Sequence, residues 1–368
     1  MSDPSPAAKR IAEEISRIAG HVPGVTKTFG DDKKLAETLA SILATDDNFQ
    51  QTGGIFFQPG SDAFETADRF TRIHVEQYRQ TGRPSLPALA MHHAQILGLD
   101  PTGPHYRALI LVAARAELAQ AVEPDYHSKF HYVDVAAMTA TYLEKNNELA
   151  AAGIPGAPYL TPEQQALALT AAIGHDLDHP GGKNPPGDHY HFEEKSFRAL
   201  EPLLIEAGLG RQEIGDFHTM LLTTSPDGPH AVLKAVAKAQ CAGQAPDWGK
   251  LDPNGKFPEL RALTTPALIQ MAAILSDADL YASSGAGMKS NVKMSELFTR
   301  ELQKAGHNFD FRSDADRQYF LDNIIGEHYA SVAGLVTAGA ALEALRAETK
   351  QNLSATAAKN APPPPAGP

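Results

Sequence analysis

The sequence predicts an all-α fold, arranged as one compact multi-helix domain. Apolar residues recur at intervals of three and four through most of the chain, which is the spacing of a buried helical face. No segment alternates β-branched with polar residues as a half-buried strand would, and no repeat period is visible. With 42% apolar and 21% charged residues, the 368-residue chain has enough hydrophobic material for a sizeable core.

Taken in order, the periodic segments predict helices of ordinary length. Apolar stripes mark the segments 11–18, 35–42, 61–80, 104–121 and 126–146. Two later helices carry start signals: Thr161 is followed by Pro162 and by Gln164, and Thr265 is followed by Pro266. Both helices then become almost wholly apolar and end in acids, so we expect them to be buried on most sides.

Stretches rich in glycine and proline predict loops between these helices. They fall at 51–60, 152–161, 180–188, 225–229 and 244–258. We therefore expect a helical arm over residues 1–29, one compact α-helical domain over residues 30–348, and a disordered tail rich in Pro and Ala over residues 349–368.

The composition excludes several classes of function. The formal net charge of −12 disfavours binding to nucleic acid, although metal ions could still attract a small phosphate ligand. The single cysteine, Cys241, rules out an intrachain disulfide and a cysteine-based zinc site. No secretory signal and no membrane-spanning apolar run is visible, so we expect a cytoplasmic protein; the oligomeric state is not indicated.

Two short stretches concentrate acid and imidazole side chains. The sequence YHSKFH places His127 and His131 one helical turn apart. The sequence HDLDHPGGKN gives His175 and His179 the same spacing, with Asp176 beside the first. The proline and two glycines that follow end the helix, so these side chains should lie at a helix end facing an opening.

A third buried helix ends in the acids of SDADL, where Asp277 and Asp279 are equally good candidates by composition. A buried carboxylate needs a cation as partner, so these groups predict a mixed nitrogen and oxygen site for Zn²⁺, Mn²⁺, Fe or Mg²⁺. Asp176 could bridge two metals, whose bridging hydroxide would attack phosphorus, and a non-ligating histidine would protonate the leaving oxygen. The competing interpretation is a structural cluster of polar groups at capped helix ends.

The stretch HDLDHPGGKN fits the pattern H-D-x2-H-x4-N and resembles the class I cyclic-nucleotide phosphodiesterases, within the wider HD metallophosphohydrolase superfamily. YHSKFH is similar to the upstream paired-histidine motif of that family, and ADLYAS (278–283) to its later metal-binding segment. LLTTSPDGPH (221–230) weakly resembles a further helix end that carries a histidine. The resemblance runs from about 120 to 335 and implies a compact all-α catalytic domain.

The resemblance also implies a role for each matching residue. His127 would be the general acid that protonates O3′, and Asp176 would bridge two divalent ions, Zn²⁺ plus Mg²⁺ or Mn²⁺. The implied metal ligands are His131, His175, Asp176 and Asp279, and the groups that orient water and ligands are His179 and Asn184. Gln318 would bind the base, although alignment on Phe320 puts Arg317 there instead. The sequence departs from the family pattern at Ser128, Pro186 and Ser225.

The expected function is therefore metal-dependent hydrolysis of a 3′,5′-cyclic nucleotide, cAMP or cGMP, to the 5′-monophosphate. The expected partner is this small molecule, with no nucleic acid and no membrane. Three alternatives stay open: another HD-type phosphohydrolase acting on a monoester or a different diester, a di-iron oxygenase using His218 and His230, and a module that only senses nucleotide.

Overall fold

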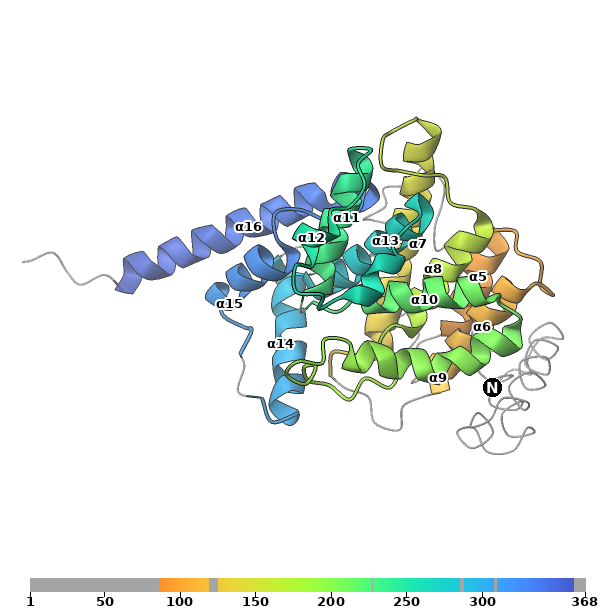
Figure 1. The fold of residues 1–368 in the computed structure, drawn as a ribbon. Coiled ribbons are helices and arrows are strands. Elements are labelled where there is room, and N and C mark those ends of the chain that lie inside the picture. The colour runs from red at the N-terminus through yellow and green to blue at the C-terminus, as the bar shows by residue number, and fades with distance from the viewer. Residues whose placement is uncertain (1–85, 119–124, 227, 285–287, 308–309, 361–368) are drawn as a thin grey trace, which may run out of the picture.

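A computed structural model describes residues 86–118, 125–226, 228–284, 288–307 and 310–360. Within them every regular element is a helix, which confirms the predicted all-α fold (Figure 1). The elements are α5 (Leu86–Ile96), α6 (Pro104–Leu118), α7 (Lys129–Ala151), α8 (Pro162–Gly174), α9 (His191–Ala207), α10 (Arg211–Leu222), α11 (Pro229–Cys241), α12 (Trp248–Leu251), η1 (Pro258–Ala262), α13 (Pro266–Ser284), α14 (Met288–Lys304), α15 (Asp314–Tyr319), η2 (Phe320–Ile325) and α16 (Val332–Asn360).

The centre of the fold is formed by α7, α8 and α13, which pack on one another. From Ala166 to Gly174, every residue of α8 is buried, as its apolar sequence predicts. Around this centre, α6 packs on α8 and α9, and α10 and α11 pack on α13. The ends of the three central helices meet, and their polar residues come together there.

The predicted start signals act as helix caps. The Thr161 side chain accepts a hydrogen bond from the Gln164 N–H (3.3 Å), and the Gln164 side chain accepts one from the Thr161 N–H (3.0 Å). Thr265 Oγ1 accepts a hydrogen bond from the Leu268 N–H at 3.2 Å. A capping residue of this kind stabilises a helix by about 1 kcal/mol, so both starts are fixed locally.

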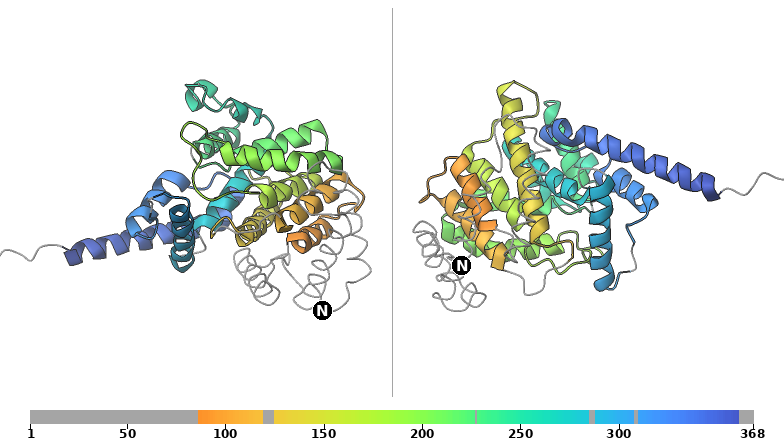
Figure 2. Two further views of the ribbon diagram at one scale, coloured as in Figure 1. Left: turned by 90° about the horizontal axis from the view of Figure 1, so that it is seen from below. Right: turned by 180° about the vertical axis from the view of Figure 1, so that it is seen from behind.

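One expectation meets a different structure. The tail predicted to be disordered from residue 349 is helical as far as Asn360, because α16 runs through Val332–Asn360; its residues 344–359 contain mainly helix-forming Ala, Lys, Glu, Gln and Leu. In Figures 1 and 2 the second half of α16 projects away from the other helices. The N-terminal arm and the segments before residue 86 lie outside the described residues.

No helix of the described ranges is long and apolar enough to span a bilayer.

Candidate metal centre

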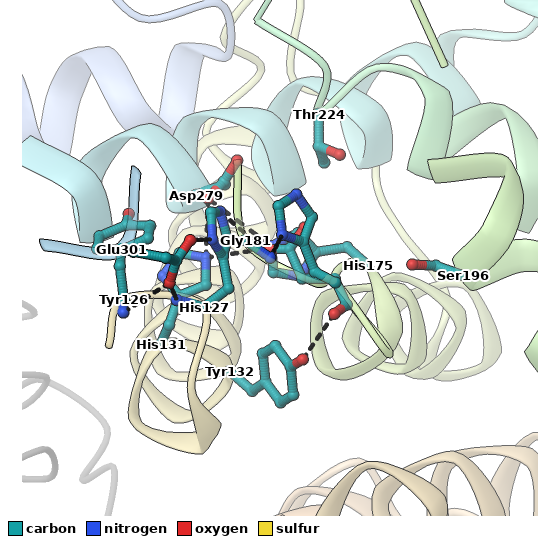
Figure 3. A network of polar contacts seen from close by, with 12 residues as sticks. Tyr126, His127, His131, Tyr132, His175, Gly181, Ser196, Thr224, Asp279 and Glu301 are labelled. Carbon is teal, nitrogen blue, oxygen red and sulfur yellow. Dashed lines mark hydrogen bonds and ion pairs between the residues drawn. The ribbon is translucent and has the colours of Figure 1, made fainter. Parts of the chain in front are cut away.

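The candidate site lies where α7 begins, α8 ends and the last turns of α13 pass (Figure 3). Nε2 of His131 lies 3.2 Å from both Asp176 Oδ2 and Asp279 Oδ1. Nε2 of His175 lies 3.0 Å and 3.7 Å from the same two oxygens. The structure therefore brings together all four side chains that the sequence analysis named as metal ligands.

The protein backbone fixes the orientation of one of these ligands. Nδ1 of His175 lies 2.9 Å from the Ala172 carbonyl oxygen, so it carries the proton and donates to that oxygen. This leaves Nε2 directed at the two carboxylates. Tyr132 donates a hydrogen bond to the Asp176 carbonyl oxygen at 2.6 Å, which holds the turn after α8 against α7. Such outer contacts set the ring orientation of metal-binding histidines.

The charges of the cluster demand a cation. Burial by itself lowers the pKa of His131, but the carboxylates of Asp176 and Asp279 beside its Nε2 raise it to about 9. Burial also opposes ionisation of Asp279, yet the two imidazoles lower its pKa to about 2. Two buried carboxylates thus require positive charge beside them, from bound protons or from a divalent ion.

A divalent cation fits these residues. Nε2 of His131 and Nε2 of His175 are both buried, and although each lies close to the two carboxylates, neither makes a hydrogen bond of normal geometry among the described residues. Buried polar atoms of this kind are rare in folded proteins unless something occupies the position beside them. The donor set of two imidazoles and two carboxylates is one that Zn²⁺ and similar divalent ions accept.

Asp176 also belongs to a second group of potential ligands. Ligand atoms of His127, Asp176 and His179 lie within 4.8 Å of one another, as do those of His131, His175 and Asp176. Asp176 is shared by both groups, so its position suits a carboxylate that bridges two ions. Nδ1 of His179, however, accepts a hydrogen bond from the Gly181 N–H at 3.1 Å, and burial lowers the pKa of His179 to about 3. The ring is therefore neutral and presents an Nε2–H donor to the site.

His127 precedes α7 instead of lying on it, which differs from the predicted shared helix face. Ser128 is the N-cap, with extended backbone angles, so the helix starts only at Lys129. The backbone N–H groups of Tyr126 and His127 donate to Glu301 Oε2 at 2.8 and 2.9 Å, and Nδ1 of His127 contacts Glu301 Oε1. Nε2 of His127 lies 3.9 Å from Asp176 Oδ2, so this ring still faces the cluster.

Glu301 is a functional candidate that sequence reasoning missed. It lies on α14, far from the motifs in sequence, and its side chain is buried. Gly181, in the left-handed region with φ 81°, makes room for it: a Cβ on that glycine would lie 2.8 Å from Glu301 Cγ. The glycines after His179 thus do more than end the helix, because one of them allows close approach of the carboxylate that holds His127.

Asn184 connects the loop to the start of α9. Its amide nitrogen donates to the His189 carbonyl oxygen and to Glu193 Oε2, each at 3.1 Å, and its oxygen accepts from the Phe192 N–H. Glu193 lines the same cavity as Asp176, and burial raises its pKa to about 7. Glu193 is a second residue missed from the sequence, where it reads only as one of two acids in a first helical turn.

Asp277 points away from the cluster. Its two oxygens accept hydrogen bonds from the Ala330 N–H at 2.7 Å and from the Ser331 N–H and Oγ at 2.6 Å. This carboxylate therefore caps the start of α16, where backbone N–H groups lack helical partners. Only Asp279 faces the histidines.

The histidines that a di-iron site would need lie away from the cavity beside the cluster. His218 lies 2.8 Å from Glu194 Oε1 and stacks on Phe197. Nδ1 of His230 lies 2.7 Å from Ser276 Oγ. Neither residue lines the cavity that contains Asp176 and Asp279.

The cavity beside the cluster has a second wall formed by α14, α15 and η2. Among its lining residues are Arg317, Tyr319 and Phe320, but not Gln318. The Gln318 amide nitrogen instead donates to the exposed side chain of Asp322 at 2.7 Å. Arg317, the residue given by alignment on Phe320, therefore lines the cavity, whereas Gln318 does not.

Known proteins resemble this chain in sequence over one segment and in the fold of their helices. Residues 126–196 match the family described as 3′5′-cyclic nucleotide phosphodiesterase. The chain is similar in structure to LmjPDEB1 in complex with IBMX, with a TM-score of 0.54 and 14% identity, over 84% of this chain and 98% of that one. At this identity the likeness shows the fold.

The phosphodiesterase domain of the RhoPDE fusion protein from the choanoflagellate Salpingoeca rosetta also matches, with a TM-score of 0.46 and 17% identity, over 84% of this chain and 97% of that one. The search of curated proteins finds no match.

Proposed function

We propose that this chain hydrolyses 3′,5′-cyclic nucleotides to 5′-monophosphates with the help of divalent ions. The resemblance of residues 126–196 to the class I cyclic-nucleotide phosphodiesterase family and the likeness in fold support this proposal. The observation that supports this most directly is the convergence of His131, His175, Asp176 and Asp279 beside a cavity. Zn²⁺ with Mg²⁺ or Mn²⁺ would be held by these four residues, with Asp176 shared. When bound, such ions neutralise phosphate charge and make water acidic enough to supply hydroxide near neutral pH.

His127 is the proposed general acid. Its Nδ1 contacts the Glu301 carboxylate, so a proton on that nitrogen is held and its Nε2–H is left to face the cavity. Protonation of the leaving O3′ from Nε2 would avoid expulsion of an alkoxide, and general acids of this kind contribute about 10²- to 10⁴-fold in rate. Glu301 would stay ionised and stabilise the imidazolium.

His179 and Glu193 would position water and substrate. The neutral His179 ring stacks on His127 with centroids 3.9 Å apart and offers an Nε2–H donor. Glu193 can accept or donate a hydrogen bond near neutral pH, because burial brings its pKa to about 7. Asn184 would hold Glu193 in place through its amide.

The test is a panel of phosphate esters with metal measured in the same sample. Cyclic AMP, cyclic GMP, nucleotide monophosphates and an unrelated diester are incubated with protein loaded with Mg²⁺ or Mn²⁺. We expect turnover of at least one cyclic nucleotide to its 5′-monophosphate. Metal-loaded protein that hydrolyses only monoesters would support another HD-type phosphohydrolase, and two irons per chain with O₂ consumption would support the oxygenase.

We propose further that residues 30–348 form the catalytic domain and that the protein acts in the cytoplasm.

A further inference from the structure

The second wall of the cavity is suited to a flat aromatic ring. Phe298 and Phe311 lie with ring centroids 5.3 Å apart, and Met294, Phe320 and Ile324 also line the cavity. Phe320 and Ile324 belong to η2, a π-helical turn, and such turns occur frequently at functional sites. Nucleobases stack on walls of this composition whatever their identity, so the apolar side chains by themselves do not choose a base.

One cation on this wall is held rigidly. Arg317 is only 3% exposed, its Nε donates to Asn291 Oδ1, and its Nη1 donates to Asp314 Oδ1. These bonds fix the plane of the guanidinium. Nη2 has no hydrogen-bond partner within the ranges that the structure describes, and the residue lines the cavity. The bond to Arg317 also fixes the Asn291 amide, whose oxygen faces the guanidinium.

A guanidinium only donates hydrogen bonds, and it cannot reverse this role by rotation as a glutamine amide can. Guanine presents two adjacent acceptors, N7 and O6, whereas adenine presents N7 beside an amino group that donates. An arginine donor therefore matches the guanine edge and faces a competing donor in adenine. Asp316 also lines this wall, but its carboxylate is engaged by Ser313 Oγ.

Resting on the proposed function, we propose that Arg317 reads the base and makes the site selective for guanine over adenine nucleotides. The phosphate would lie at the metal centre and the base between the aromatic side chains of α14 and η2. Arg317 is then the specificity residue of the site, and Gln318, which points to Asp322, has no part in recognition.

The experiment compares kcat/KM for cyclic GMP and cyclic AMP in the full chain and in three variants. One hydrogen bond from a charged donor such as Nη2 discriminates between bases by on the order of 10- to 100-fold, so we expect cyclic GMP to be preferred by that ratio in the unmodified chain. Arg317→Gln should bring the ratio close to one, because its amide can pair with either edge. Gln318→Ala is the matched control and should keep the ratio.

Arg317→Lys is a second test that remains if Arg317→Gln does not fold. It keeps the positive charge beside Asp314 but loses the fixed Nη2 donor, so the ratio should also fall while thermal melting shows a folded protein. Equal rates for both nucleotides in the unmodified chain, a preference for cyclic AMP, or a ratio unchanged in both Arg317 variants would overturn the inference.

A binding measurement separates this inference from the proposed function. Calorimetry with GMP and AMP, using Mn²⁺-loaded protein, reports the base preference without turnover. Tighter binding of GMP that is lost in Arg317→Gln would support the role of Arg317 even if neither cyclic nucleotide is hydrolysed. Equal binding of both nucleotides would refute it even if both are hydrolysed.

Discussion

Asp277 and Asp279 lie two residues apart on α13, and their substitution should have different effects on cation binding. Asp279 lies 3.2 Å from His131 Nε2, whereas Asp277 bonds only to the start of α16. Asp279→Asn and Asp277→Asn are isosteric changes that each remove one charge. We expect the first to weaken cation binding by on the order of 100-fold, as loss of about 3 kcal/mol from a charged contact implies, and the second to leave it intact.

The size of the effect follows from mass action. A cation present at 100 times its dissociation constant stabilises the native state by about 2.7 kcal/mol. For a domain of about 320 residues, an unfolding entropy of about 2.1 cal/mol/K per residue gives about 1.5 °C in melting temperature per kcal/mol, so EDTA should lower the Tm of the unmodified chain by about 4 °C. If Asp279→Asn weakens binding 100-fold, the same cation concentration stabilises by only about 0.4 kcal/mol, and the EDTA shift shrinks to about 0.6 °C.

Asp277→Asn should lower the Tm with and without EDTA by the same amount. One of the three groups that donate hydrogen bonds to Asp277 would face an amide N–H₂ group in the variant, and a buried donor without an acceptor costs about 1–3 kcal/mol. Removal of a charge whose burial raises its pKa to about 6 offsets part of this loss at neutral pH. The assay is differential scanning fluorimetry with Mn²⁺ or EDTA, with metal content measured in parallel.

The reasoning is refuted if Asp279→Asn keeps the full response to EDTA, or if Asp277→Asn loses it. Either result would place the cation away from the four converging side chains.

Three further predictions concern the residues around this centre. His127→Ala should lower turnover by about 10²- to 10⁴-fold with metal content unchanged; loss of metal in this variant would make His127 a ligand instead of the acid. Glu301→Gln should lower kcat by about 10- to 100-fold, the worth of one charge-assisted hydrogen bond, with KM and metal content preserved; an unchanged kcat would remove its positioning role. Burial lowers the folded-state pKa of His230 to about 3, so the stabilisation by the neutral ring is complete above about pH 6.5 and is lost as the pH falls towards 3. Between pH 7 and pH 4 the melting temperature of the unmodified chain should therefore fall more steeply than that of His230→Asn. Parallel curves of melting temperature against pH would contradict this.

The sequence determined the helical class and predicted the candidate metal ligands. Helical periodicity and local caps are short-range properties, so Thr161 and Thr265 could be named as helix starts without coordinates. The four metal-binding candidates were likewise named from local motifs, because the spacing of His175 and Asp176 places them together at one helix end. The predicted start of the disordered tail, residue 349, lies too early in the chain, because residues 349–360 contain few helix breakers and continue α16.

Only the tertiary structure decided which distant groups meet. Asp277 and Asp279 are indistinguishable by composition, and the packing of α13 against α7 and α16 turns one to the histidines and the other to a helix cap. Glu301 and Gly181 are 120 positions apart, and no local pattern connects them. Arg317, not Gln318, faces the cavity because the orientation of a short helix is set by its packing against α14 and α16 and by the π-helical turn that follows. Long-range contacts of this kind depend on how whole helices pack, which local spacing does not encode.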